Sequence, residues 1–139
     1  MNNLYLTITT PERVVLETEV RSVNVPTLDG EIGILQNHIP LVSILAPGEL
    51  SLTTIKGEQQ VMAVSGGFVE VRDNQIVILA DTAEKAEEID EARAQAAREK
   101  AQALMQERAT DDVGFADAQA AMAKELARLK VVRKHRKSI

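Results

Sequence analysis

The chain has 139 residues, of which 45% are hydrophobic and 27% charged, and its net charge is −5, so we expect a folded protein with a substantial core. The absence of cysteine excludes disulfides, thiol catalysis and thiolate zinc sites, while two histidines and three aromatic residues are too few for a multi-histidine metal site or a platform for single-stranded nucleic acid. The first residues lack the pattern of a signal peptide and no apolar run approaches the ~20 residues that span a bilayer, so we expect a cytosolic protein.

The first part of the chain has the pattern of short β-strands. Apolar residues alternate with polar ones at Leu4, Leu6 and Ile8, which predicts a strand with one buried face. Residues 75–80 are apolar on both faces and predict a central strand. Pairs of turn-forming residues separate the runs; they are Asp29-Gly30, Pro47-Gly48, Lys56-Gly57, Gly66-Gly67 and Asp73-Asn74. We therefore expect residues 4–80 to form an antiparallel β-sandwich.

After Asp81 alanine dominates and the apolar period becomes helical. The first stripe contains Ala94, Ala97, Ala101 and Leu104, and predicts a helix over 89–108. The second predicts a helix over 115–134 and contains Phe115, Ala118, Met122, Leu126, Leu129 and Val132. The break between them offers Asp112 as an N-cap and is short enough to make the helices an antiparallel hairpin. The sequence thus predicts two domains, a β-sandwich over 1–84 and a helical hairpin over 85–139.

The composition of the hairpin predicts how firmly it docks. Burying an alanine methyl contributes about 0.8 kcal/mol, against ~2–3 kcal/mol for a leucine side chain. A seam rich in alanine therefore gains little per contact, while alanine keeps each helix stable when it is alone. We expect either a hairpin that detaches at low cost or an ordinary two-helix cap.

The end of the chain carries an uncompensated positive charge. From residue 128 onward there are six cations and no acid, so the remaining residues carry a net charge of −11. The cations are Arg128, Lys130, Arg133, Lys134, Arg136 and Lys137. A basic tail on an acidic body predicts an acidic partner for the tail.

Three separated motifs resemble those of the epsilon subunit of F-type ATP synthases. They are DGEIGILQNHIPL at 29–41, AVSGGFVEV at 63–71 followed by ILAD at 78–81, and IDEARA at 89–94. Together with the order of a β part followed by a helical hairpin, they cover essentially the whole chain. The resemblance implies a non-catalytic rotor subunit whose sandwich docks on the gamma subunit and the c-ring.

The same resemblance implies a regulatory role for the hairpin. In this family it switches between a form folded on the sandwich and an extended form that reaches the alpha/beta catalytic hexamer and opposes ATP hydrolysis. The basic tail matches the segment that meets acidic parts of the catalytic subunits. The resemblance also implies a peripheral location on the cytoplasmic face of a bacterial membrane, without direct membrane insertion.

The resemblance assigns Glu31 and His38 to the rotor interface. The plainer alternatives are a turn and a bulge at Gly30 and Gly33, and an ordinary surface histidine. The run Ser65-Gly66-Gly67 looks like a phosphate loop, but no lysine follows it and a strand comes next. Close backbone packing at a strand end explains it better.

The third motif matches the segment that binds ATP in some bacterial members. The matching positions are Glu84, Asp90, Arg93 and Lys100, so ATP is an expected regulatory ligand, with no obligatory cofactor. Arg93 and Lys100 share a helix face about 10 Å apart, a spacing suited to a polyphosphate. Lys100 replaces an arginine of those members and presents a point charge instead of a planar fork. The alternative is structural, with Asp90 capping the helix and Arg93 paired to an acid.

Other classes of function have weaker support. A nucleic-acid role for the tail conflicts with the acidic body and the scarcity of aromatic residues. An enzyme would use His38 as its base, with Ser43 or Ser65 as nucleophile, although nothing in the sequence singles these serines out. A free-standing β-sandwich protein-binding module with a basic helical tail leaves the alanine-rich hairpin unexplained. Co-purification with a large membrane-associated ATPase separates these classes.

Overall fold

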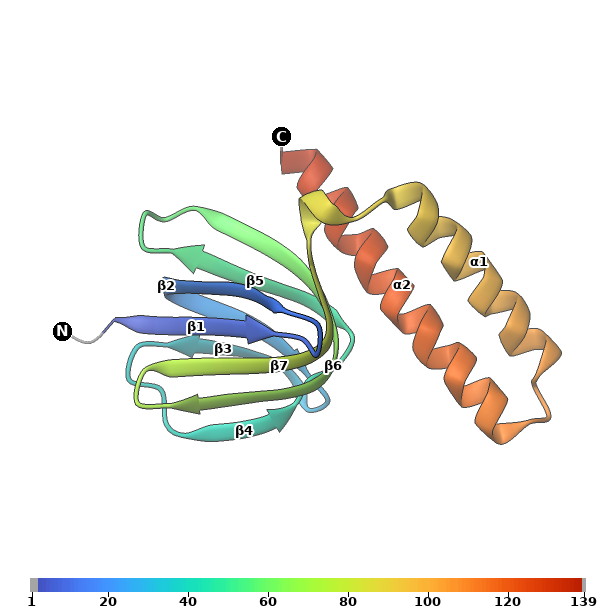
Figure 1. Ribbon diagram of the computed structural model, residues 1–139, viewed down its shortest axis with the longest axis horizontal. Helices are drawn as coiled ribbons and strands as arrows, with labels where there is room; N and C mark the ends of the chain where they lie inside the picture. The colour runs from blue at the N-terminus through green and yellow to red at the C-terminus, as the bar shows by residue number, and fades with distance from the viewer. Residues whose placement is uncertain (1–2, 139) are drawn as a thin grey trace.

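The computed structural model describes the backbone of residues 3–138 and the side chains of residues 3–135. A seven-stranded β structure is followed by a short 3-10 helix and two long helices (Figure 1). The elements are β1 (Leu4–Thr9), β2 (Val14–Thr27), β3 (Gly30–Leu35), β4 (Leu41–Ile44), β5 (Gly48–Thr54), β6 (Gln59–Arg72), β7 (Gln75–Lys85), η1 (Ala86–Glu88), α1 (Glu91–Glu107) and α2 (Asp112–Ser138). The predicted order of a β-sandwich followed by a two-helix hairpin is confirmed, although β7 runs five residues beyond the expected end of the β part.

The hydrogen-bonded strands close into a ring. β1 pairs with β2 on one side and with β7 on the other, and β7, β6, β5 and β2 follow one another around the ring. The long strand β2 pairs with β1 along its first half and with β3 along its second half. The long strand β6 likewise pairs with β5 along its first half and with β4 near its end. The β1–β7 pairing is parallel, so the expectation of a purely antiparallel sandwich is wrong at this one ladder. Closure leaves β1 without a free edge.

The core of the sandwich follows the period of two in the sequence. Leu4, Leu6 and Ile8 of β1 are all buried, as the alternation predicts. β7 is central, as predicted, and Ile76 and Ile78 are fully buried, but Leu79 on its other face is 52% exposed. The apolar character of this strand on both faces therefore marks an exposed apolar surface as well as a core.

A glycine pair bends β6 in its middle. Gly66 and Gly67 have φ values of +69° and +97°, a region that side chains with a Cβ disfavour. A Cβ at Gly67 would lie 1.8 Å from the carbonyl oxygen of Leu79 on β7. The expected close backbone packing is present, but it lies inside the strand and not at its end. Gly30 lies at a turn with φ +108°, whereas Gly33 lies in an unbroken β2–β3 register, so the bulge expected there is absent.

Both helices begin where side chains or carbonyls satisfy the first amides. Asp90 is the N-cap of α1, and its Oδ1 accepts a hydrogen bond from the Arg93 backbone N at 3.1 Å. α2 begins at Asp112, one residue after the aspartate whose carbonyl accepts from Phe115 N at 2.8 Å. The prediction of Asp112 as the N-cap is therefore wrong by one position, because the helix already includes it.

α2 lies between the sandwich and α1, so it is buried on two faces (Figure 1). Leu129 and Val131 are both fully buried although they lie about 200° apart around the helix. They share a small core with Ala63, Ile89 and Ala94, separate from the core of the sandwich. Docking therefore rests on more than alanine, contrary to the expectation from composition.

The buried stripe of α2 also differs in one position. Leu126 is 42% exposed, whereas Glu125 beside it is buried. The predicted stripe includes Leu126 because a stripe defined by apolar residues alone takes no account of a buried acid with a cationic partner. Within residues 3–138, neither helix combines the length and apolar character that crossing a bilayer requires.

Candidate functional site

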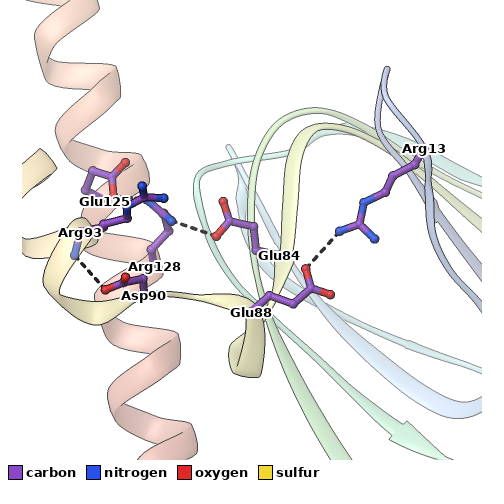
Figure 2. Close-up of polar contacts among 7 residues, drawn as sticks. All are labelled: Arg13, Glu84, Glu88, Asp90, Arg93, Glu125 and Arg128. Carbon is purple, nitrogen blue, oxygen red and sulfur yellow. Dashed lines mark hydrogen bonds and ion pairs between the residues drawn. The ribbon is translucent and has the colours of Figure 1, made fainter.

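Two carboxylates hold one arginine where the sandwich meets the hairpin (Figure 2). Arg128 of α2 donates from Nε to Glu84 Oε2 of β7 at 3.0 Å, and from its Nη1 to Glu125 Oε2 at 2.7 Å. The side chains of Arg128, Glu84 and Glu125 are 19%, 27% and 9% exposed. Partial burial lowers the pKa of Arg128, but hydrogen bonds and charges from Glu125 and Glu84 outweigh it and raise that pKa above its ordinary value. The cluster ties α2 to the end of β7.

The residues predicted to bind ATP surround this cluster in part. Figure 2 places Glu84, Asp90 and Arg93 around the β7–α1 connection, beside Arg128. Glu84 is engaged by Arg128, and Asp90 caps α1, as the structural alternative predicted. The side chains of Arg93 and Lys100 are exposed on α1, and Lys100 lies two turns farther along the helix.

A second carboxylate of the sandwich contacts α2 near its C-terminal end. Oε1 of Glu49 on β5 lies 2.5 Å from Nζ of Lys134, and its Oε2 lies 3.8 Å from Nζ of Lys130. We call Glu49, Lys130 and Lys134 the Glu49 clamp. A polar cleft of about 730 Å³ opens beside it, lined in part by Glu31 and Gln59. The clamp was not predicted, since Glu49 follows a Pro-Gly turn without any motif.

The basic tail is therefore partly paired within the chain. Arg133 donates from Nε to Glu91 Oε1 at 3.1 Å, which joins α2 to α1. With the two clusters above, four of the six predicted tail cations contact acids of the same chain. The other two side chains, Arg136 and Lys137, lie outside the described side chains. The sequence predicts an acidic partner for the tail, and in the docked form the chain itself supplies acids for these four cations.

The two predicted rotor residues lie at different ends of β3. Glu31 is the second residue of the strand, and His38 follows its last residue by three positions. The strand alone separates them by about 13 Å. His38 Nδ1 lies 2.7 Å from the carbonyl oxygen of Ile39. The loop that carries His38 is fixed by Asn37, whose backbone N donates to Asn74 Oδ1 at 2.6 Å.

An exposed apolar face covers β4, β6 and β7. Ile44, Phe68 and Leu79 form one cross-strand row, because Phe68 is paired with Ile44 on one side and Leu79 on the other. Leu28 donates its backbone N–H to Ile44, and Val42 lies two residues from Ile44 on the same face of β4. These five side chains are 50% to 70% exposed. We call them the apolar face; the doubly apolar pattern of β7 was the one signal for it in the sequence.

Strand pairing separates Ser65, one of the two serines considered above, from His38. Ser65 lies in β6, opposite Thr82, near the bend. Leu41, three residues after His38, pairs with Val71 near the other end of β6. Val71 lies six residues, or about 20 Å of extended strand, from Ser65. Among residues 3–138 no group of three histidine or acidic side chains is placed to hold a metal ion.

The chain matches known proteins along its length. Residues 3–86 match the β-sandwich domain of the ATP synthase delta/epsilon chain, and residues 87–133 match the long α-helix domain of the same chain. Among solved structures, a chain in the Euglena gracilis mitochondrial ATP synthase with OSCP, F1 and c-ring superposes with a TM-score of 0.79 at 29% identity, covering 92% of this chain and 79% of that one. A chain of the Tetrahymena thermophila mitochondrial ATP synthase central stalk and c-ring (TM-score 0.53, 20% identity, covering 63% and 69%) supports the fold alone.

Sequence relatives give the same result. The chain is 48% identical over 134 residues to the ATP synthase epsilon chain of Chloroflexus aggregans, covering 96% of this chain and 94% of the relative. It is 44% identical over 137 residues to the epsilon chain of Dehalococcoides mccartyi, covering 99% and 97%. Both relatives named here are ATP synthase epsilon chains, and this chain belongs to the ATP synthase delta/epsilon family.

Proposed function

We propose that this chain is a rotor subunit that couples rotation of the c-ring to ATP synthesis and inhibits ATP hydrolysis through its hairpin. Its partners are the gamma subunit, the c-ring and the alpha/beta catalytic hexamer. The observation that carries the proposal is the division of the molecule into a closed sandwich with an exposed apolar face and a hairpin docked on another part of it. The match to a chain in an assembly of F1 and c-ring supports it.

The apolar face supports docking of the sandwich, residues 1–84, on the gamma subunit. A monomeric soluble protein rarely exposes contiguous apolar side chains such as Ile44, Phe68 and Leu79 without a partner. Glu31 and His38 would then meet the rotor at separate points and not as one site. Because contacts made by a closed ring of strands do not depend on the hairpin, assembly should survive removal of the hairpin.

The attachment of the hairpin, residues 85–139, supports a regulatory role. α1 packs mainly on α2, and α2 meets the sandwich through one side, with ion pairs at Glu84 and Glu49. Partly exposed ion pairs are worth about 0.2–1 kcal/mol each, so acidic surfaces of the catalytic subunits compete with these contacts on equal terms. A peripheral location on the cytoplasmic face of the bacterial membrane follows from the assembly.

ATP is the proposed regulatory ligand of the docked form. Arg93 and Lys100 are exposed and available to phosphates, while Glu84 and Asp90 already have partners within the chain. Binding of ATP at Glu84 therefore requires Arg128 to share or change its partner. No chemistry on the nucleotide is proposed for this chain.

Truncation tests the proposal. We expect removal of all residues after Glu88 to leave assembly and ATP synthesis largely intact and to raise ATP hydrolysis by the complex, because the inhibitory segment is lost and the sandwich remains. The measurement compares synthesis and hydrolysis rates of membranes carrying the full-length or the truncated subunit. Loss of assembly on truncation, or unchanged hydrolysis, contradicts the proposed division of roles.

A further inference from the structure

The Glu49 clamp joins a fixed part of the molecule to the proposed inhibitory segment. Glu49 is the second residue of β5, which is one of the strands of the closed ring, and its side chain is 11% exposed. Lys130 and Lys134 are one helical turn apart on α2, so both reach the same carboxylate. The carboxylate belongs to the sandwich and the lysines belong to the hairpin.

The clamp lies next to the apolar contact that docks α2. Glu49 pairs in register with Ala63 of β6, and Ala63 belongs to the small core that contains Leu129 and Val131. Separation of α2 from the sandwich must therefore break the clamp and expose this core together. The polar cleft beside the clamp gives water and salt direct access to it.

We infer that Glu49 is an internal competitor for the inhibitory cations, so that neutralising this carboxylate raises the fraction of chains whose hairpin is undocked. The inference rests on the proposed function for the inhibitory role of the tail. Lys130 and Lys134 cannot pair with Glu49 and with acids of the catalytic subunits at the same time. In the docked form their acidic partner is Glu49 of the sandwich, and in the extended form it is an acid of the catalytic subunits. Neutralising the lysines weakens both states, whereas neutralising Glu49 weakens only the docked state.

The docked fraction is measurable because the chain contains no cysteine. Val131 is fully buried in the small core that also contains Ala63 of β6, so the rate at which a thiol reagent labels a Val131→Cys variant reports the undocked fraction. We expect Glu49→Gln to raise this rate about two- to thirty-fold, because it removes two ion pairs. Glu58→Gln, which neutralises an exposed acid at the β5–β6 turn, serves as the matched control and should leave the rate unchanged. A Val69→Cys reporter in the sandwich core should label equally slowly in all variants, which shows that the fold is intact.

The assembled complex separates the clamp from the proposed function. Glu49→Gln in the full-length subunit should lower ATP hydrolysis several-fold, because the tail is released toward the catalytic subunits. Labelling at the wild-type rate in Glu49→Gln overturns the clamp, whatever truncation does to hydrolysis. A second outcome is faster labelling of Glu49→Gln with unchanged hydrolysis. If truncation after Glu88 still raises hydrolysis, this outcome overturns the competition between Glu49 and the catalytic subunits. If truncation leaves hydrolysis unchanged, it is the proposed function that is overturned.

Discussion

Replacement of Arg128 by methionine tests the cluster that ties α2 to β7. The variant keeps most of the aliphatic volume and leaves Glu125 and Glu84 facing each other without a cation. Breaking a fully buried pair costs about 3–5 kcal/mol. Arg128 and Glu84 keep 19% and 27% exposure, so we expect a smaller loss of about 2–3 kcal/mol in the free energy of hairpin opening.

Hydrogen exchange measures this loss directly. A change of about 2–3 kcal/mol corresponds to amide exchange about 30- to 150-fold faster in residues 127–132 of α2. Amides of β7 around Ile78 should keep their protection, because that strand belongs to the closed ring. The double variant Arg128→Met with Glu125→Gln should recover at least half of the loss, since it removes the unpaired buried charge. Equal exchange in the single and double variants would refute this account of the cluster.

Three further predictions concern the sandwich, its partner and the nucleotide. Gly67→Ala should destabilise the sandwich by about 2–4 kcal/mol in urea unfolding, because the new Cβ meets the Leu79 carbonyl and φ is positive; Gly30→Ala, at φ +108° with open space around it, should cost only about 1–2 kcal/mol. Phe68→Asp should block binding to the gamma subunit in a pull-down with purified gamma, whereas Val113→Asp, at an even more exposed apolar position on the hairpin, should not; equal binding by both removes the apolar face from the interface. Arg93→Ala should weaken ATP binding in calorimetry by about 1.5–3 kcal/mol, the scale of a charge-assisted hydrogen bond, and absence of heat for the wild-type chain at millimolar ATP contradicts the site.

Local sequence patterns predicted the helices and strands, because the formation of these elements depends on the period of apolar residues and on turn-forming residues. The alternation around Leu6 and the stripe around Ala94 each predicted the correct type of element and the correct buried face. The parallel β1–β7 ladder could not be predicted. The two strands are 70 residues apart in the sequence, and no local pattern shows whether such distant strands pair in parallel or antiparallel. Helix termini were misjudged by a few residues, because either aspartate at 111–112 has the chemistry of a cap.

The candidate site was harder to predict because its members meet only in three dimensions. Glu84 and Arg128 are 44 residues apart and Glu49 and Lys134 are 85 residues apart. The charge asymmetry of the tail was visible in the sequence, but the acids that pair with it lie on four elements, β5, β7, α1 and α2. The burial of Glu125 was not predicted, because a glutamate on a helix is expected to face solvent. Only the position of Arg128, which pairs with it, reveals that it is buried.

The closed ring of strands determines the order in which the molecule can form. β1 needs β7 as its parallel partner, so the ring cannot close until about residue 79 has been synthesised. Contacts between such distant segments slow folding, and β1 has an exposed edge until then. The hairpin needs only local contacts and forms quickly, but α2 has no surface to dock on before β5 and β6 pair. Docking of the hairpin therefore follows the pairing of β5 and β6, and a chain in which these two strands have not paired carries its basic helices free.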